Sequence, residues 1–174
     1  MLVRRAGPDD AADLAALGAR TFVESFGHLY SPQDLQAFLD DSHAQAAYAK
    51  LLADPAYALW LAFGDDGEAM GYALAGPAGL PHEDVKSADG ELKRLYMRAD
   101  AQGSGIGTRL FDEALAWLER DGPRTLWIGV WSGNEKAQRL YAHHGFTFAG
   151  EYLFPVGKTL DREFILRRRA SFTG

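Results

Sequence analysis

Three glycines at every second position, Gly103, Gly105 and Gly107, lie between an apolar run and the start of a helical pattern. Glycines spaced this closely leave backbone N–H groups uncovered by side chains. A helix that begins directly after them adds the positive end of its dipole. The residue types and their spacing therefore predict a turn that holds a phosphate group.

Two common phosphate-binding turns do not match this segment. A P-loop requires Lys-Ser or Lys-Thr directly after its last glycine, and the Lys158-Thr159 pair follows Gly157 without a strand–loop–helix context. A dinucleotide-binding turn would require glycine at position 108, where Thr108 stands, and would lie near the first strand. The turn is therefore expected to bind another class of phosphate-containing ligand.

A second group of residues could carry chemistry further along the chain. Asn134, Ala137 and Tyr141 are spaced at i, i+3 and i+7, so they share one face of the predicted helix. Tyr141 offers a hydroxyl group on this face. The alternative for Tyr141 is a half-buried core tyrosine whose hydroxyl is already hydrogen-bonded.

Both groups resemble one family. Gln102–Gly107 resembles the Q/R-x-x-G-x-G/A signature of the GNAT superfamily of N-acetyltransferases. Asn134–Tyr141, followed by Gly145-Phe146, resembles the N-x-x-A-x-x-x-Y…G-F segment of the same superfamily. Further segments are similar to PaiA-type polyamine (spermidine/spermine) N-acetyltransferases: Thr21-Phe22, Ser25-Phe26, Gly129-Val130-Trp131 and Tyr152…Gly157…Asp161.

The resemblance implies an enzyme that uses acetyl-CoA as co-substrate and needs no metal. It implies one α/β domain over residues 1–174, with a central mixed twisted sheet of about seven strands flanked by about four helices. The implied acetyl-CoA-binding residues are Leu95, Tyr96, Met97, Gln102, Gly103, Ser104, Gly105, Ile106, Gly107, Thr108, Asn134, Ala137 and Tyr141.

Acetyl transfer to an amine needs a neutral amine, a polarised carbonyl and a proton for the departing thiolate. On the family pattern, Glu91 is the expected base, directly or through water, and the backbone N–H of Met97 polarises the carbonyl. Tyr141 is the expected general acid. Trp131 and Glu91 are expected beside the acceptor, although Glu91 could equally be a solvated residue at a loop–strand junction.

Strands and helices must position these residues. Period-two alternation is expected to place Glu91, Lys93, Leu95 and Met97 on one face of their strand. The expected strands are 2–5, 58–63, 69–74, 91–97, 125–131, 146–154 and 162–168. The expected helices are 8–26, 32–39, 44–53, 105–120 and 134–143, and a long loop covers 76–90.

Composition limits the possible functions. The chain has 174 residues, a net charge of −6 and no cysteine. An acidic chain argues against non-specific nucleic-acid binding, and no apolar run is long enough to span a membrane. The absence of cysteine excludes disulfides and thiolate metal sites and is compatible with a cytoplasmic protein.

Several functions remain open on this basis. The first expectation is acetylation of a polyamine or similar small amine, and the second is acetylation of a protein N-terminus or lysine. Alternatives from other classes are a non-catalytic CoA-binding regulatory module and a structural interaction domain. A homodimer also stays open.

Overall fold

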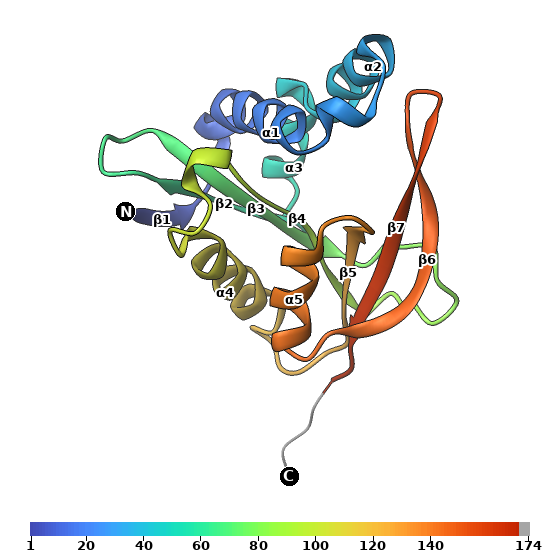
Figure 1. Ribbon diagram of the computed structural model, residues 1–174. Coiled ribbons are helices and arrows are strands. Elements are labelled where there is room, and N and C mark those ends of the chain that lie inside the picture. Colours follow the sequence, from blue (N-terminus) through green and yellow to red (C-terminus); the bar gives the residue numbers. More distant parts are fainter. Residues whose placement is uncertain (171–174) are drawn as a thin grey trace.

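The computed structural model describes residues 1–170 and contains one mixed sheet with helices on both faces (Figure 1). The strands hydrogen-bond in the order β1-β2-β3-β4-β5-β7-β6. All neighbouring pairs are antiparallel except β4 and β5, which run parallel. The strands are β1 (Leu2–Arg5), β2 (Ala58–Phe63), β3 (Ala69–Pro77), β4 (Gly90–Met97), β5 (Leu126–Trp131), β6 (Thr147–Val156) and β7 (Thr159–Arg168).

Two groups of helices cover the two faces of the sheet (Figure 1). One face carries α1 (Ala11–Phe26), α2 (Pro32–Ser42) and α3 (Gln45–Ala53), and the other carries α4 (Ile106–Leu118) and α5 (Glu135–His143). Each face has its own apolar cluster, because a sheet must bury both faces when helices cover both. The predicted α/β fold class is confirmed.

Local sequence signals explain where α2 begins and which face of α1 is buried. Ser31 precedes α2, and its side-chain oxygen accepts a hydrogen bond from the Asp34 N–H at 3.1 Å. Pro32 occupies the first helical position, where its missing N–H costs nothing. In α1 the apolar residues at helical spacing are buried against the sheet, as their periodicity predicts.

The β6–β7 hairpin is longer than the sequence predicted. We expected Pro155, Val156 and Gly157 to separate the two strands, but β6 continues to Val156 and β7 begins at Thr159. Pro155 is tolerated because β6 is an edge strand of the sheet. The tip of the hairpin reaches α2, where Asp34 accepts hydrogen bonds from the Lys158 N–H and the Thr159 hydroxyl.

The parallel strands β4 and β5 pair over only a short length. Gly90–Leu92 pairs with Leu126–Ile128, and no residue of β4 beyond Leu92 pairs with β5. β4 meanwhile stays paired with β3 as far as Met97. The two strands therefore diverge and leave a gap in the middle of the sheet.

A β-bulge in β4 changes which side chains share a face. Ala75 lies opposite Leu92 and Leu74 lies opposite Arg94, so Lys93 is an extra residue in β4. Leu95 and Met97 consequently pack with Leu92 in the cluster beneath α4. Glu91 precedes Leu92 and points to the opposite face. The expectation that Glu91, Leu95 and Met97 share a face is wrong, because strict alternation ignores the bulge.

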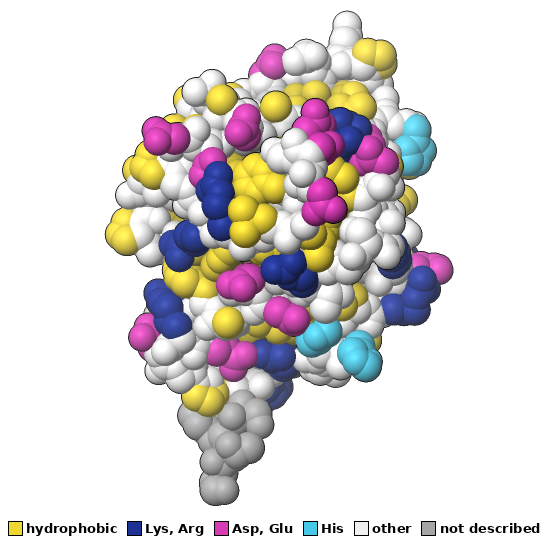
Figure 2. All heavy atoms as spheres, turned by 90° about the vertical axis from the view of Figure 1, so that its left-hand side faces the viewer, with side chains coloured by type: hydrophobic (Ala, Val, Ile, Leu, Met, Phe, Trp, Pro, Cys, Tyr) yellow, Lys and Arg dark blue, Asp and Glu magenta, His cyan; other side chains and the backbone are white. Residues whose placement is uncertain are grey.

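Surface charge is mixed on the face that Figure 2 presents. Lys and Arg side chains alternate there with Asp and Glu side chains, and no continuous basic area is visible. Among residues 1–170, no helix has the length and apolar character that crossing a membrane requires.

Candidate active site

The glycine turn between β4 and α4 presents backbone N–H groups without partners. Gly103 and Gly105 have φ angles of 83° and 85°, which side chains with a Cβ rarely adopt. Within residues 1–170, no hydrogen bond uses the N–H of Gly105, Ile106 or Gly107. These N–H groups stand at the positive end of a helix of 13 residues. The turn therefore has the geometry of an anion site.

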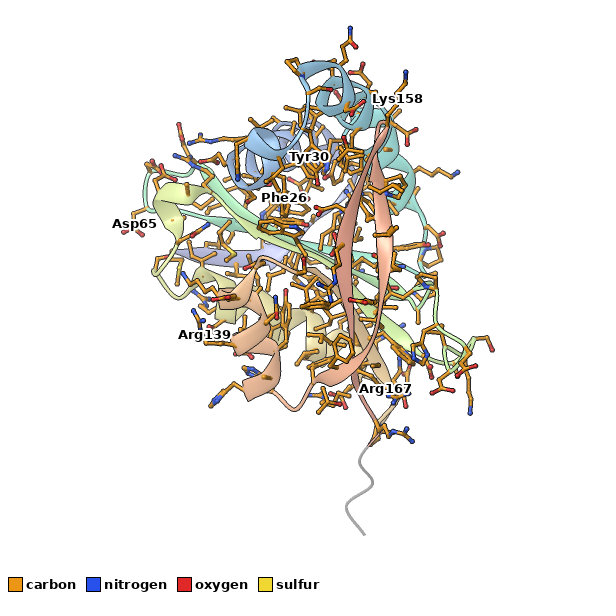
Figure 3. The ribbon with its side chains drawn as sticks, turned by 45° about the vertical axis from the view of Figure 1, so that its right-hand side comes forward. Phe26, Tyr30, Asp65, Arg139, Lys158 and Arg167 are labelled. Carbon is orange, nitrogen blue, oxygen red and sulfur yellow. The ribbon has the colours of Figure 1, made fainter. Side chains whose placement is uncertain are left out.

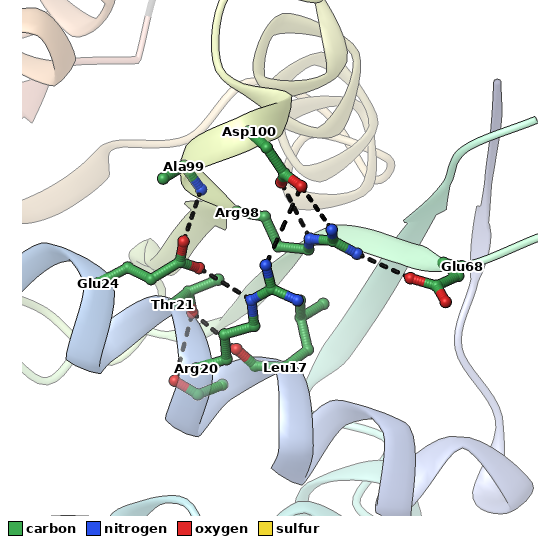
Figure 4. A network of polar contacts seen from close by, with 9 residues as sticks. Leu17, Arg20, Thr21, Glu24, Glu68, Arg98, Ala99 and Asp100 are labelled. Atoms are coloured by element: carbon green, nitrogen blue, oxygen red, sulfur yellow. Dashed lines mark hydrogen bonds and ion pairs between the residues drawn. The ribbon is translucent and has the colours of Figure 1, made fainter. Parts of the chain in front are cut away.

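Helix α1 holds the segment that leads into the turn (Figure 4). Ala99 begins a short 3-10 turn, Ala99–Ala101, and its N–H donates to Glu24 at 3.2 Å. Arg20 donates to the other oxygen of Glu24 at 3.2 Å, and Arg98 binds Asp100 through two nitrogens. Each exposed pair contributes little free energy, but together they fix the entry to the glycine turn.

The edge of β4 that faces the gap carries unpaired N–H groups. The Arg98 N–H donates to the carbonyl of Met70 next to β3 at 2.8 Å. Because alternate residues of an antiparallel strand point their N–H groups at the partner, those of Leu95 and Met97 point away from β3. The Met97 N–H thus faces the gap between β4 and β5, where the sequence expectation requires it.

A cavity of about 210 Å³ occupies this gap. Its walls come from both faces of the sheet, since α5 contributes Tyr141 and α1 contributes Phe22 and Phe26. Figure 3 shows Phe26 and Tyr30 pointing inward between α1 and the β6–β7 hairpin. The aromatic wall consists of Phe22, Phe26, Tyr30, Phe38, Tyr96, Trp131, Tyr141, Tyr152 and Phe154.

Tyr141 lies on the α4–α5 side of this cavity with its side chain 5% exposed. Its ring packs against Phe111 and Phe146, with centroids 5.6 and 6.4 Å away. Its hydroxyl has no hydrogen-bond partner among the described residues, unlike the core tyrosine considered as the alternative. Burial raises the pKa of Tyr141 above its usual value, so the hydroxyl keeps its proton at neutral pH.

The other residues of the predicted helix face have different surroundings. The Asn134 side-chain oxygen accepts from the Ala137 N–H at 3.1 Å and so caps α5. Asn134 also lines the cavity, whereas Ala137 packs against the cluster beneath α4. The side-chain carbonyl group of Asn134 therefore already has a structural role as the N-terminal cap of α5.

Glu91 is buried at the cavity wall, not solvated, with 7% of its surface exposed. One oxygen accepts from the Gly79 N–H at 2.9 Å and from the Lys93 ammonium at 3.2 Å. The carboxylate is thus held by a charge-assisted pair and by a backbone donor.

Asp161 on β7 is bound at both oxygens. The Trp131 ring N–H donates to one oxygen at 2.9 Å, and the Tyr30 hydroxyl donates to the other at 2.6 Å. Burial and the Asp161 carboxylate raise the pKa of Tyr30 above its usual value. These bonds fix Trp131 at the cavity wall, where the sequence placed it.

Glu163, which the sequence interpretation missed, stands opposite Trp131 in the β5–β7 register and lines the same cavity. Among residues 1–170 it has no hydrogen bond and no ion pair. Burial and the nearby Asp161 carboxylate raise its pKa to about 8. One sequence signal could have revealed Glu163. Period-two alternation places Asp161 and Glu163 on the same strand face as the buried Ile165.

The structure brings part of the predicted site together around the cavity. The predicted residues that line it are Glu91, Leu95, Tyr96, Trp131, Asn134 and Tyr141. Met97, Ala137 and the turn residues 102–108 lie outside its lining. Met97 nevertheless touches the turn, because a Cβ added at Gly107 would be 2.7 Å from the Met97 methyl group.

Comparison with known proteins gives a consistent result. The sequence profile described as the Acetyltransferase (GNAT) family matches residues 21–146. An uncharacterized N-acetyltransferase of Mycobacterium bovis is 33% identical over 91% of this chain and 97% of its own length. A spermine/spermidine N(1)-acetyltransferase of Bacillus subtilis is 28% identical over 56% of this chain and 65% of its own.

A solved structure shares the fold. It is the PaiA N-acetyltransferase of Thermoplasma acidophilum in complex with coenzyme A. The two chains superpose with a TM-score of 0.76 over 97% of this chain and 98% of the other, at 16% identity. At that identity the likeness concerns the fold.

Proposed function

This chain belongs to the Acetyltransferase (GNAT) family, and on that basis we propose that it acetylates a small primary amine, with a polyamine as first candidate. Membership makes it an acetyl-CoA-dependent N-acetyltransferase. The acceptor and the residue roles below are our proposal. The observation that carries it is a cavity through the sheet that combines an aromatic wall with carboxylates.

The glycine turn suits the pyrophosphate of acetyl-CoA. Its N–H groups lack partners within residues 1–170, and the absence of a Cβ at Gly103 and Gly105 lets a ligand approach the backbone. When bound, acetyl-CoA supplies an activated acetyl group as a thioester. We assign the turn residues to phosphate binding and the open edge of β4, at Leu95 and Met97, to binding the pantetheine arm.

Two further groups act on the acetyl group in this proposal. The Met97 N–H, which faces the gap, donates a hydrogen bond to the carbonyl oxygen and polarises it. The Tyr141 hydroxyl donates its proton to the departing sulfur. The hydroxyl lines the cavity without a partner among residues 1–170 and carries its proton at neutral pH, so the proton is available for transfer.

The acceptor side favours a cationic amine. Glu163, Asp161 and Trp131 bring carboxylates and an aromatic face to one wall, and both attract an ammonium group. A narrow cavity of about 210 Å³ accepts a chain-like amine more readily than a folded protein segment. The similarity to the Bacillus subtilis spermine/spermidine enzyme supports the choice of polyamines as first candidates.

Thermal shift and thiol release test this function. We expect acetyl-CoA to raise the melting temperature, since a ligand that binds only the folded state stabilises it. We then expect thiol release on addition of spermidine or spermine, measured against a panel of other amines and N-terminal peptides. Release without any added amine serves as the background.

Each alternative has its own outcome in this assay. Release only with peptides would replace the small-amine proposal with acetylation of a protein N-terminus or lysine. A thermal shift without release from any amine would indicate a non-catalytic CoA-binding module. No shift with acetyl-CoA would contradict the assignment of the glycine turn.

A further inference from the structure

We propose that Glu163 on β7 receives the ammonium group of the acceptor and takes its proton before acetyl transfer. This inference rests on the proposed function, because it concerns the acceptor side of the same cavity. It assigns to Glu163 the role that the sequence expectation gave to Glu91.

The cavity wall carries three carboxylates, Glu91, Asp161 and Glu163. Glu91 is bound by Lys93 and the Gly79 N–H, and Asp161 is bound by Trp131 and Tyr30. Within the described residues, only Glu163 among the three has neither a hydrogen bond nor an ion pair. This half-buried carboxyl group is therefore free to accept a hydrogen bond from a ligand.

The neighbours of Glu163 strengthen its affinity for a proton or a cation. The Asp161 carboxylate, two residues away on β7, is the charged group that raises its pKa. The titratable groups that face it from other elements are Tyr30, Tyr96 on β4 and Tyr152 on β6. Burial and the charge of Asp161 raise the pKa of Glu163 to about 8, close to the pH at which a general base works best.

The cations of the same cavity wall already have partners. Lys93 is paired with Glu91, and Arg94 donates to the Tyr48 hydroxyl at 3.0 Å and lies over its ring. Glu91 already accepts hydrogen bonds from the Lys93 ammonium and the Gly79 N–H, so it is less available to a ligand. Glu163 has only a like charge beside it, and this favours proton uptake.

In the proposed acetyl transfer, every proton and every bonding electron pair has a donor and an acceptor. One Glu163 oxygen takes a proton from R–NH₃⁺, which leaves a lone pair on the amine nitrogen. That pair forms the C–N bond with the acetyl carbon while the C–S bond of the thioester breaks. The departing sulfur receives a proton from Tyr141, and the second amine proton restores the Tyr141 hydroxyl. Glu163 then releases its proton to solvent.

The test compares three glutamine variants with the wild-type enzyme. Glu163→Gln removes the base and keeps the size of the side chain. Glu151→Gln is the matched control, because Glu151 lies on the neighbouring strand β6, binds Arg162 and does not line the cavity. Glu91→Gln tests the competing assignment. Melting curves with and without acetyl-CoA verify that each variant folds and binds the co-substrate.

We expect Glu163→Gln to lower kcat/KM at pH 7.5 by about 10²-fold and to abolish the rise of the wild-type pH profile near pH 8. Glu151→Gln should stay within about twofold of the wild type, as expected for an exposed carboxylate outside the cavity. With a weakly basic analogue of the acceptor, which is already neutral at pH 7.5, the deficit of Glu163→Gln should shrink. A purely structural role would give the same deficit with both amines.

Two results would overturn this inference while leaving the proposed function intact. One is a Glu163→Gln enzyme with wild-type rate and pH profile. The other is loss of the inflection in Glu91→Gln but not in Glu163→Gln. If the wild-type enzyme itself releases no thiol with any amine, the proposed function fails first, so the two failures can be told apart.

Discussion

At the scale of single residues, Tyr141 and Glu163 both line the cavity, and neither side chain has a polar partner among residues 1–170. Tyr141 has an unbound hydroxyl on the α4–α5 side, and Glu163 has an unbound carboxyl group on the α1 side. The Tyr141 hydroxyl carries its proton at neutral pH, and the raised pKa of Glu163, about 8, lets its carboxyl group exchange a proton near neutral pH. An acid and a base for acetyl transfer thus lie in one cavity.

Removal of the Tyr141 hydroxyl should slow turnover without preventing it. We expect Tyr141→Phe to reduce kcat by at most about 10²-fold, since a thiolate is a tolerable leaving group even without an acid. The KM for acetyl-CoA should change little, because the ring and its packing remain. Tyr57→Phe is the control, since Tyr57 does not line the cavity. Full activity of Tyr141→Phe in the thiol-release assay would contradict its assignment as acid.

Stability should depend on pH through Glu163. Its pKa rises from 4.5 to about 8 on folding, so the folded protein binds this proton more tightly. The corresponding stability is complete below about pH 4.5 and is lost as the pH rises to about 8. Glu163→Gln removes this loss, so its melting temperature relative to the wild type should increase between pH 5 and pH 8. Parallel melting-temperature curves for the two proteins would contradict the raised pKa.

Sequence spacing found one of these residues and missed the other for a physical reason. Tyr141 belongs to a local helix pattern, so its position relative to Asn134 follows from the sequence. Glu163 acquires its surroundings from the pairing of β7 with β5 and from Tyr30, which lies far away in the sequence. The roles given to Glu91, Met97 and Tyr141 remain predictions.

At the scale of elements, the glycine turn should combine a conformational requirement with a binding function. Gly105→Ala places a Cβ at a φ angle of 85°, which costs about 1 kcal/mol of stability. We also expect weaker acetyl-CoA binding, because the strained turn shifts the N–H groups of the anion site. Gly67→Ala is a matched control, since Gly67 has a φ angle of 83° in the β2–β3 hairpin.

Both variants should lose similar stability in thermal melts, but only Gly105→Ala should raise the KM for acetyl-CoA. Equal KM values for acetyl-CoA in the two variants would contradict the assignment of the turn to acetyl-CoA binding. The comparison therefore separates backbone strain from ligand binding.

The order of the elements was predictable, and two of their details were not. Capping residues, apolar periodicity and glycine turns gave all seven strands and the helices α1–α5. The bulge at Lys93 was missed because it arises from pairing with β3. The true length of the β6–β7 hairpin was missed because Pro155 ends a strand only when the strand has two neighbours.

At the scale of the whole molecule, the fold class followed from the resemblance to the GNAT superfamily, and the profile match and the superposition confirm it. The homodimer that the sequence left open stays a prediction. The opening between β4 and β5 could not be derived from the sequence alone. The divergence of the two strands after Leu92 depends on how the whole sheet pairs.

This opening has a consequence for the order of events during turnover. Since the cavity has walls on both faces of the sheet, we expect the co-substrate to enter beside α4 and α5 and the amine to enter beside α1 and the β6–β7 hairpin. Neither molecule then has to leave before the other arrives. Initial-rate measurements at varied concentrations of both substrates should give intersecting double-reciprocal lines. Parallel lines would mean that the acetyl group is first transferred to the enzyme and reaches the amine only after coenzyme A has left.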